Sequence, residues 1–65
     1  MTLYEYFKNM NDSAINKIRI GDNSAFWEER RDFSARVLSK LTVSEARLKL
    51  KDLTSFEIEK IIQAA

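Results

Sequence analysis

The side chains best able to do chemistry in this 65-residue chain are carboxylates and cations, because the sequence contains no histidine and no cysteine. Histidine is the commonest general base, the cysteine thiolate is a strong nucleophile, and both are the usual ligands of zinc. Glu28 and Glu29 are adjacent, but neighbouring side chains point apart on a helix and on a strand, so these two carboxylates cannot flank one bond. The sequence therefore predicts a protein that is not an enzyme and that uses no metal or other cofactor.

Most of the cations lie in one part of the chain. Residues 30–51 hold seven basic and two acidic residues, whereas the net charge of the whole chain is only +1. The seven are Arg30, Arg31, Arg36, Lys40, Arg47, Lys49 and Lys51. Two pairs of them, Arg36 with Lys40 and Arg47 with Lys51, are four residues apart and therefore share a helix face. This segment predicts a basic patch that meets phosphates or an acidic protein surface, and the alternative is an ordinary solvated face.

Three apolar side chains are also candidates for a partner-binding surface. Trp27 precedes Arg30 and Arg31, and Trp and Arg are both enriched at binding hot spots, although a single Trp can instead form the centre of a small core. Leu48 and Phe56 point away from the apolar stripes of their own predicted helices, which is typical of an interface with a partner or with a second copy. The alternative is that they are covered by other elements or are exposed without a role.

Three helix starts are predicted by one pattern, a Thr followed three residues later by a Glu. The pairs are Thr2 with Glu5, Thr42 with Glu45, and Thr54 with Glu57. The first helix is expected to run to about residue 11, where turn-forming residues follow, and the second for about three turns. The last continues to the C-terminus with an apolar face of Ile58, Ile61, Ile62 and Ala65. Since few residues separate the last two helices, they are predicted to form an αα-hairpin.

The middle of the chain supports two interpretations. Residues 17–20 alternate polar and apolar side chains, residues 21–24 favour a turn, and residues 25–28 can return as a second strand. The alternative is one helix from Ser24 to Leu41 in which Phe26, Phe33, Val37 and Leu41 share a face. The favoured fold class is α+β and mainly helical, a single domain over residues 1–65 with a helix, a two-stranded β-hairpin and three short helices. The alternative is an all-α bundle.

The segment from Ile18 to Trp27 carries a resemblance to a known class of proteins. It reads Ile-Arg-Ile-Gly-Asp-Asn-Ser-Ala-Phe-Trp and follows a Met-Thr-Leu-x-Glu-Tyr start. The first 28 residues or so resemble small uncharacterised phage and prophage proteins in which an N-terminal helix precedes an I-R-I-G-x-x-S-x-F hairpin. The resemblance implies an origin in a mobile element and no particular activity.

These features predict a non-enzymatic protein-interaction module, an accessory protein of a phage or other mobile element that binds and modulates a host protein. Inhibition of a host defence nuclease is one specific form of this prediction. The alternative is a small nucleic-acid-binding protein that uses residues 30–51, although an isoelectric point near 8.0 is low for that class. The predicted partner-binding residues are Trp27, Arg30, Arg31, Arg36, Lys40, Arg47, Leu48, Lys51 and Phe56.

Location and assembly are predicted from length and composition. The first residues lack the basic and apolar regions of a signal peptide, and the sequence has no run of about 20 apolar residues, so we expect a cytoplasmic protein with no membrane partner. A phage-encoded copy would occupy the host cytoplasm. Since so short a chain buries only about 60% of its surface and forms no disulfide here, a homodimer is also expected.

Overall fold

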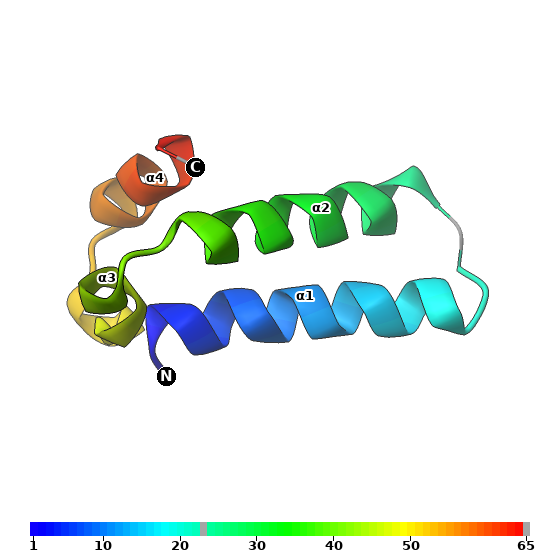
Figure 1. Ribbon diagram of the computed structural model, residues 1–65, viewed down its shortest axis with the longest axis horizontal. Coiled ribbons are helices and arrows are strands. Elements are labelled where there is room, and N and C mark those ends of the chain that lie inside the picture. Colours follow the sequence, from blue (N-terminus) through cyan, green and yellow to red (C-terminus); the bar gives the residue numbers. More distant parts are fainter. Residues whose placement is uncertain (23, 65) are drawn as a thin grey trace.

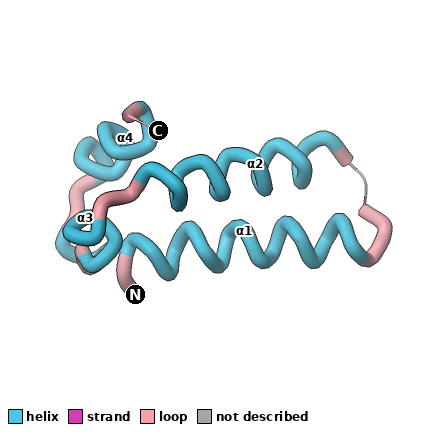
Figure 2. The backbone as a smooth tube through the Cα atoms, in the orientation of Figure 1, coloured by secondary structure: helices cyan, strands magenta, loops and turns pink. Residues whose placement is uncertain are grey.

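The computed structural model describes residues 1–22 and 24–64 and is dominated by two long antiparallel helices that lie side by side (Figure 1). Helix α1 spans Leu3–Arg19 and helix α2 spans Ala25–Lys40. The two long helices form a helical hairpin. The shorter elements lie at its open end, opposite the loop that joins α1 to α2, as the backbone tube shows (Figure 2). They are helix α3 (Val43–Arg47), a 3₁₀ turn (Leu50–Asp52) and helix α4 (Ser55–Gln63). None of the described helices is long and apolar enough to cross a membrane.

The core lies where the short elements meet the two long helices. Leu3 and Phe7 of α1 and Val37 of α2 are fully buried and form its centre. Partly buried side chains from every helical element except α3 complete it, namely Met10, Phe33, Leu38, Leu41, Leu50, Leu53, Ile61 and Ile62. The C-terminal helix is therefore held by the same cluster that joins α1 to α2.

All three predicted capping boxes are confirmed. In each, the Thr hydroxyl accepts a hydrogen bond from the backbone N–H three residues later, while the Glu carboxylate accepts one from the Thr N–H. The donor–acceptor distances lie between 3.0 and 3.2 Å. These reciprocal bonds satisfy N–H groups that have no partner inside the helix, which is why α1, α3 and α4 begin where they do.

The capping box of α1 makes stability depend on pH. Hydrogen bonds from the Thr2 backbone N–H and then from its hydroxyl hold the pKa of Glu5 below its ordinary value of 4.5. This contribution to stability is complete above the unfolded-state pKa and is lost as the pH falls through the folded-state pKa. We expect Glu5→Gln to flatten the fall in melting temperature between about pH 5 and pH 3, measured by circular dichroism. Glu29→Gln, an exposed carboxylate outside any capping box, is the control, and equal slopes in both variants would contradict the assignment.

The predicted β-hairpin over residues 17–28 is wrong. Residues 17–19 form the last turn of α1, residues 25–28 form the first turn of α2, and no β-strand occurs in residues 1–22 or 24–64. An isolated antiparallel pairing of Thr2 with Lys49 is present instead. The all-helical alternative is confirmed, and its helix from Ser24 to Leu41 is α2 with its two capping residues.

Gly21 closes α1 and does not form a hairpin turn. Its φ angle is +100°, its N–H donates to the Ile18 carbonyl at 3.1 Å, and the Asp22 N–H donates to the Lys17 carbonyl at 3.0 Å. This pair of bonds defines a Schellman motif, in which a glycine in the left-handed region satisfies the last carbonyls of a helix. The alternation of polar and apolar side chains over residues 17–20 is too short to favour a strand over this helix ending. Asn23, part of the predicted turn, lies outside the described residues.

Replacement of Gly21 by alanine tests this helix end. A Cβ at this position would meet no atom within 4 Å, so the expected loss of about 1–2 kcal/mol in the free energy of unfolding comes from backbone conformation alone. The measurement is urea denaturation followed by circular dichroism. Ser24→Ala is the control because the Ser24 side chain makes no capping hydrogen bond, and we expect it to be nearly neutral. Equal stability of the two variants would contradict the Schellman assignment.

Helix α1 also continues beyond residue 11, where the sequence predicted its end. Met10 and Ala14 extend the buried stripe of Leu3 and Phe7 at spacings of three and four residues, and Ala14 is fully buried. Of the turn-forming side chains here, Asn9, Asp12 and Ser13 are exposed, and Asp12 meets Lys8 at 3.4 Å. Asn11 is half-buried, and its Oδ1 is buried without a hydrogen-bond partner. Tertiary packing of the stripe therefore outweighs the weak local preference for a turn.

The three-turn helix predicted after Thr42 is broken after Arg47. The backbone of Leu48 and Lys49 is extended because residues 1–3 lie beside it. The Leu3 N–H donates to the Leu48 carbonyl at 2.8 Å, and the Leu50 N–H donates to the Met1 carbonyl at 2.9 Å. The predicted αα-hairpin is replaced by an extended segment and a 3₁₀ turn between α3 and α4. Ala65, which was predicted to extend the apolar face of α4, lies outside the described residues.

Candidate functional site

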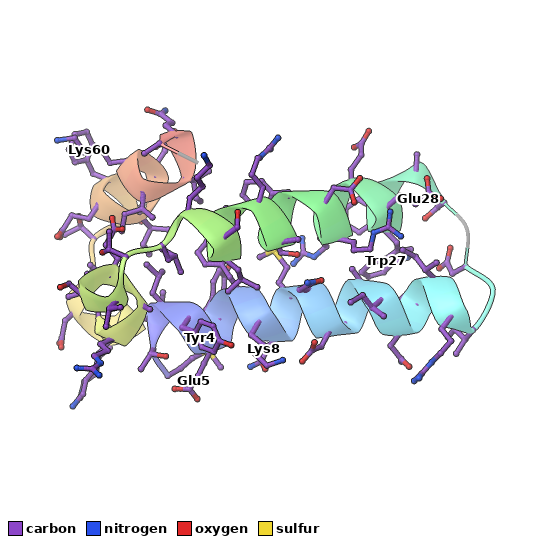
Figure 3. The ribbon with its side chains drawn as sticks, viewed as in Figure 1. Tyr4, Glu5, Lys8, Trp27, Glu28 and Lys60 are labelled. Atoms are coloured by element: carbon purple, nitrogen blue, oxygen red, sulfur yellow. The ribbon has the colours of Figure 1, made fainter. Side chains whose placement is uncertain are left out.

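An aromatic pair lies near the loop that joins α1 to α2. The rings of Phe26 and Trp27 meet edge to face, with centroids 4.9 Å apart and an interplanar angle of 77°. Trp27 is half-buried and points between α1 and α2, whereas Glu28 points away from α1 (Figure 3). Phe26 is 57% exposed. Trp27 lies outside the core cluster, so the interpretation that it forms the centre of the core is wrong.

Trp27 is held in place from three directions. Its indole N–H donates to Asp22 Oδ2 at 2.9 Å, and Lys17 Nζ lies 5.7 Å from its ring centroid. Phe26 covers a third side. Contacts from α1, from the loop and from α2 therefore fix the indole, and this fixed ring supports the exposed Phe26.

Of the two predicted arginines that closely follow Trp27, Arg30 belongs to this group. Its guanidinium carbon lies 5.8 Å from the Phe26 ring centroid, in the geometry of a cation–π contact. We call Lys17, Phe26, Trp27 and Arg30 the tip cluster. Arg31 instead pairs with the neighbouring Asp32 at 3.1 Å, and its exposure limits the energy of that pair. Within the described residues, neither Lys17 nor Arg30 lies at ion-pair distance from a carboxylate.

The other predicted basic residues are spread over several elements. Arg36 and Lys40 are exposed on α2, Arg47 ends α3, and Lys51 lies in the 3₁₀ turn. Arg30 and Lys40 alone are about 15 Å apart along the helix axis, at 1.5 Å per residue. Glu28, Glu29 and Asp32 also occur on α2. The structure does not bring the basic segment together into one compact patch.

Leu48 and Phe56 lie at the α4 end of the molecule. Leu48 is 41% exposed and lines a groove of about 390 Å³ together with Leu53, Ile61 and Ala64. Glu45, Glu57 and Lys60 complete the lining. Phe56 is 71% exposed and lines a neighbouring hollow of about 230 Å³ with Glu59, Lys60 and Gln63. Lys60 belongs to both surfaces, and its Nζ lies 5.9 Å from the Phe56 ring centroid.

Sequence reasoning missed several members of these two surfaces. Lys17 and Asp22 were assigned to a strand and a turn, so their contacts with Trp27 were not expected. Lys17 reaches the ring of Trp27, ten residues later in the sequence, only because α1 and α2 fold back against each other. The contact of Phe56 with Lys60 could be predicted more easily, because a spacing of four residues places both side chains on one helix face.

Among residues 1–22 and 24–64, no three acidic side chains gather closely enough to hold a metal ion. The hydrogen-bonded carboxylates of Glu5, Glu45 and Glu57 cap helices. Comparisons with protein-family models, with curated proteins and with solved structures found no match for this chain.

Proposed function

We propose that this chain is a non-enzymatic protein-interaction module that binds a partner protein through the tip cluster. The observation that carries the proposal is the exposed Phe26 ring, which is supported by a Trp27 side chain fixed through Asp22 and Lys17. Aromatic and arginine side chains dominate binding hot spots, and Phe26, Trp27 and Arg30 supply both kinds.

The rigidity of the cluster supports this role. A partner that binds flexible side chains must fix them, at a cost of about 0.5–1.5 kcal/mol for each rotamer-rich side chain. The tip cluster is already ordered by its hydrogen bond and cation–π contacts. A partner with an apolar side chain to cover Phe26, and with carboxylates to meet Lys17 and Arg30, fits this surface.

The identity of the partner rests on the resemblance to phage and prophage proteins. Under the proposal, the partner is a host protein that the chain modulates, and a defence nuclease is one example. The mobile-element origin and the cytoplasmic location stay predictions.

Capture from host lysate with matched variants tests the proposal. We expect immobilised wild-type chain and the Val43→Asp variant to retain the same host protein, and the Phe26→Asp variant to lose it. Val43 is 69% exposed on α3 and therefore controls for the addition of a carboxylate to an exposed apolar site. Circular dichroism checks that both variants fold. Equal capture by the two variants, or no retained protein, would contradict binding through the tip cluster.

Nucleic-acid binding through residues 30–51 is the alternative, and it makes a different prediction. A protein that neutralises several phosphates binds tightly at low salt and loses affinity steeply as salt rises. Because the basic side chains are spread over α2, α3 and the 3₁₀ turn, we expect no mobility shift of duplex or single-stranded DNA at 50 or 200 mM salt. A shift at low salt that disappears at high salt, and that is reduced by Arg36→Ala, would favour the alternative.

A further inference from the structure

We propose that the element of the partner protein that binds the tip cluster is an acidic amphipathic helix, and that it lies along one flank of the α1–α2 hairpin. The proposal rests on the proposed function and adds to it the shape and the charge of the partner's binding element. The helix occupies the length of the hairpin between α4 and the loop that joins α1 to α2 (Figure 1).

This flank carries the exposed part of the tip cluster. Phe26 and Phe33 are seven residues apart on α2, so they project on the same side of its buried stripe. Phe33 directly precedes the buried Ser34, as Ser13 of α1 directly precedes the buried Ala14. In two antiparallel right-handed helices, residues that directly precede the facing positions lie on the same side of the pair. We call the following residues the open flank: Ser13, Lys17, Phe26, Arg30 and Phe33.

Helix α4 covers the same side of the hairpin at its other end. Lys40 is seven residues after Phe33 and projects with it, and together with Val37 it lines a small cavity with Ile61 and Ala64 of α4. The nine residues of α4 span about 13 Å, whereas the 16 residues of α2 span about 24 Å. About 10 Å of the hairpin, or two helical turns, therefore continues beyond α4 on this side.

A helix is the element that fits this length. Two packed helices form a furrow that a third helix fills with apolar side chains three and four residues apart, and α4 fills it in this way with Ile61 and Ile62. A partner strand would need a free backbone edge, whereas residues 10–17 and 29–33 lie inside helices that make their own backbone hydrogen bonds. Phe26, which is 57% exposed, and the half-buried Phe33 supply the apolar surface.

The charges on the open flank require this helix to be acidic. Lys17 and Arg30 are half-buried beside aromatic rings, and neither lies at ion-pair distance from a carboxylate of residues 1–22 and 24–64. A basic or neutral helix would cover both cations and leave them unpaired, at a cost, whereas carboxylates beside its apolar stripe neutralise them. The acidic residues of the same stretch lie roughly 120° or more from the centres of the buried stripes, at 100° per residue. They are Asp12, Glu28, Glu29 and Asp32.

Opposite substitutions at Ser13 test the sign of the partner's charge. Ser13 is exposed on the open flank but does not belong to the tip cluster. We expect Ser13→Asp to weaken, and Ser13→Lys to strengthen, binding of the host protein that the wild-type chain retains from lysate. Each change should be roughly threefold at low salt, the effect of one ion pair near a surface. The measurement is biolayer interferometry with the purified host protein.

The same two substitutions at Ser39 are the control. Ser39 is exposed on the side of α2 that is turned away from α1, roughly 160° from the centre of the buried stripe. Both Ser39 variants are expected to bind like the wild type, and circular dichroism must show that all four variants keep their helices. A merely structural effect at position 13 would weaken binding in both Ser13 variants.

Zero-length crosslinking of the wild-type complex identifies the element directly. A carbodiimide joins an amine to a carboxylate only where the two are in contact. We expect a link from Lys17 to an Asp or Glu in a helical segment of the host protein, and none from Lys8, which pairs with Asp12 on the exposed side of α1. Nuclease treatment of the lysate should leave capture unchanged.

Three results would overturn the acidic helix. The first is equal or reversed binding by Ser13→Asp and Ser13→Lys. The second is a link from Lys17 to a segment that is not helical in the host protein, or links from Lys8 in place of Lys17. The third is loss of capture after nuclease treatment, because the flank then takes nucleic acid. Binding through the tip cluster is tested separately by Phe26→Asp, so each of these results can occur while that variant still loses the host protein.

Discussion

Replacing Phe7 by alanine is expected to lower the free energy of unfolding by about 3–5 kcal/mol, the usual cost of removing a fully buried phenylalanine. The Phe7 side chain has no exposed surface and lies at the centre of the core cluster. Its ring meets Tyr6 at a centroid distance of 5.1 Å and Phe33 of α2 at 6.2 Å, both edge to face. Since small domains have little stability to spare, a large fraction of this variant should be unfolded at 25 °C.

Urea denaturation followed by circular dichroism measures the effect. Ile15→Ala is the matched control because it also shortens an apolar side chain of α1, but at a site that is 45% exposed. We expect this control to cost less than about 1 kcal/mol. All samples need one protein concentration, since self-association would add to the apparent stability. A Phe7→Ala variant no less stable than Ile15→Ala would show that the core is not centred on this ring.

The helix starts could be predicted because their causes are local. Each capping box needs only a Thr and a Glu three residues apart, and all three formed as expected. The end of α1 was missed although its signals were also local. Gly21 follows a last helical turn that contains Lys17 and Arg19, which is a common helix ending, but the same glycine also fits a strand turn.

Helix α2 was difficult to predict because its buried side is only partly apolar. Trp27, Arg30, Ser34, Val37 and Leu41 follow one another at spacings of three and four residues, and all are buried or half-buried. Arg30 and Ser34 interrupt this stripe, so a pattern based on hydrophobicity alone does not detect its period. Val37 packs with Leu3 and Phe7 of α1, and Trp27 contacts Lys17 of α1, so the helix is defined by tertiary packing more than by local preference.

The two surfaces differ in how much of them could be predicted. The angular position of Phe56 on its helix predicted that it would lie off the core, and it is exposed. Leu48 is exposed as well, but the helix on which its position was predicted ends at Arg47. Their use as a binding surface stays a prediction. The tip cluster depends on a helix–loop–helix geometry that was expected to be a β-hairpin, so only Trp27 and Arg30 could be proposed from the sequence. Side chains brought together by a loop cannot be paired before its conformation is known.

Replacing Ser34 by leucine is expected to lower the free energy of unfolding by about 1–3 kcal/mol, although it adds an apolar side chain to a buried site. Ser34 has no exposed surface, and its hydroxyl donates to the carbonyls of Arg30 and Arg31 at 2.8 and 3.0 Å. These acceptors lie in its own helix, so the side chain needs no partner from α1. We therefore expect the small volume of Ser34 to matter more than its hydroxyl; Ala14 of α1 is likewise small and fully buried.

Ser34→Ala separates volume from hydrogen bonding. It keeps the side chain small and removes the hydroxyl, and alanine favours a helix over serine by about 0.5 kcal/mol. We expect its stability to stay within about 1 kcal/mol of the wild type in urea denaturation, well above that of Ser34→Leu. If Ser34→Leu is as stable as Ser34→Ala and both match the wild type, α1 and α2 are not closely packed around Ser34. A similar loss in Ser34→Ala and in Ser34→Leu, both of which lack the hydroxyl, would instead assign the stabilising role to the hydroxyl.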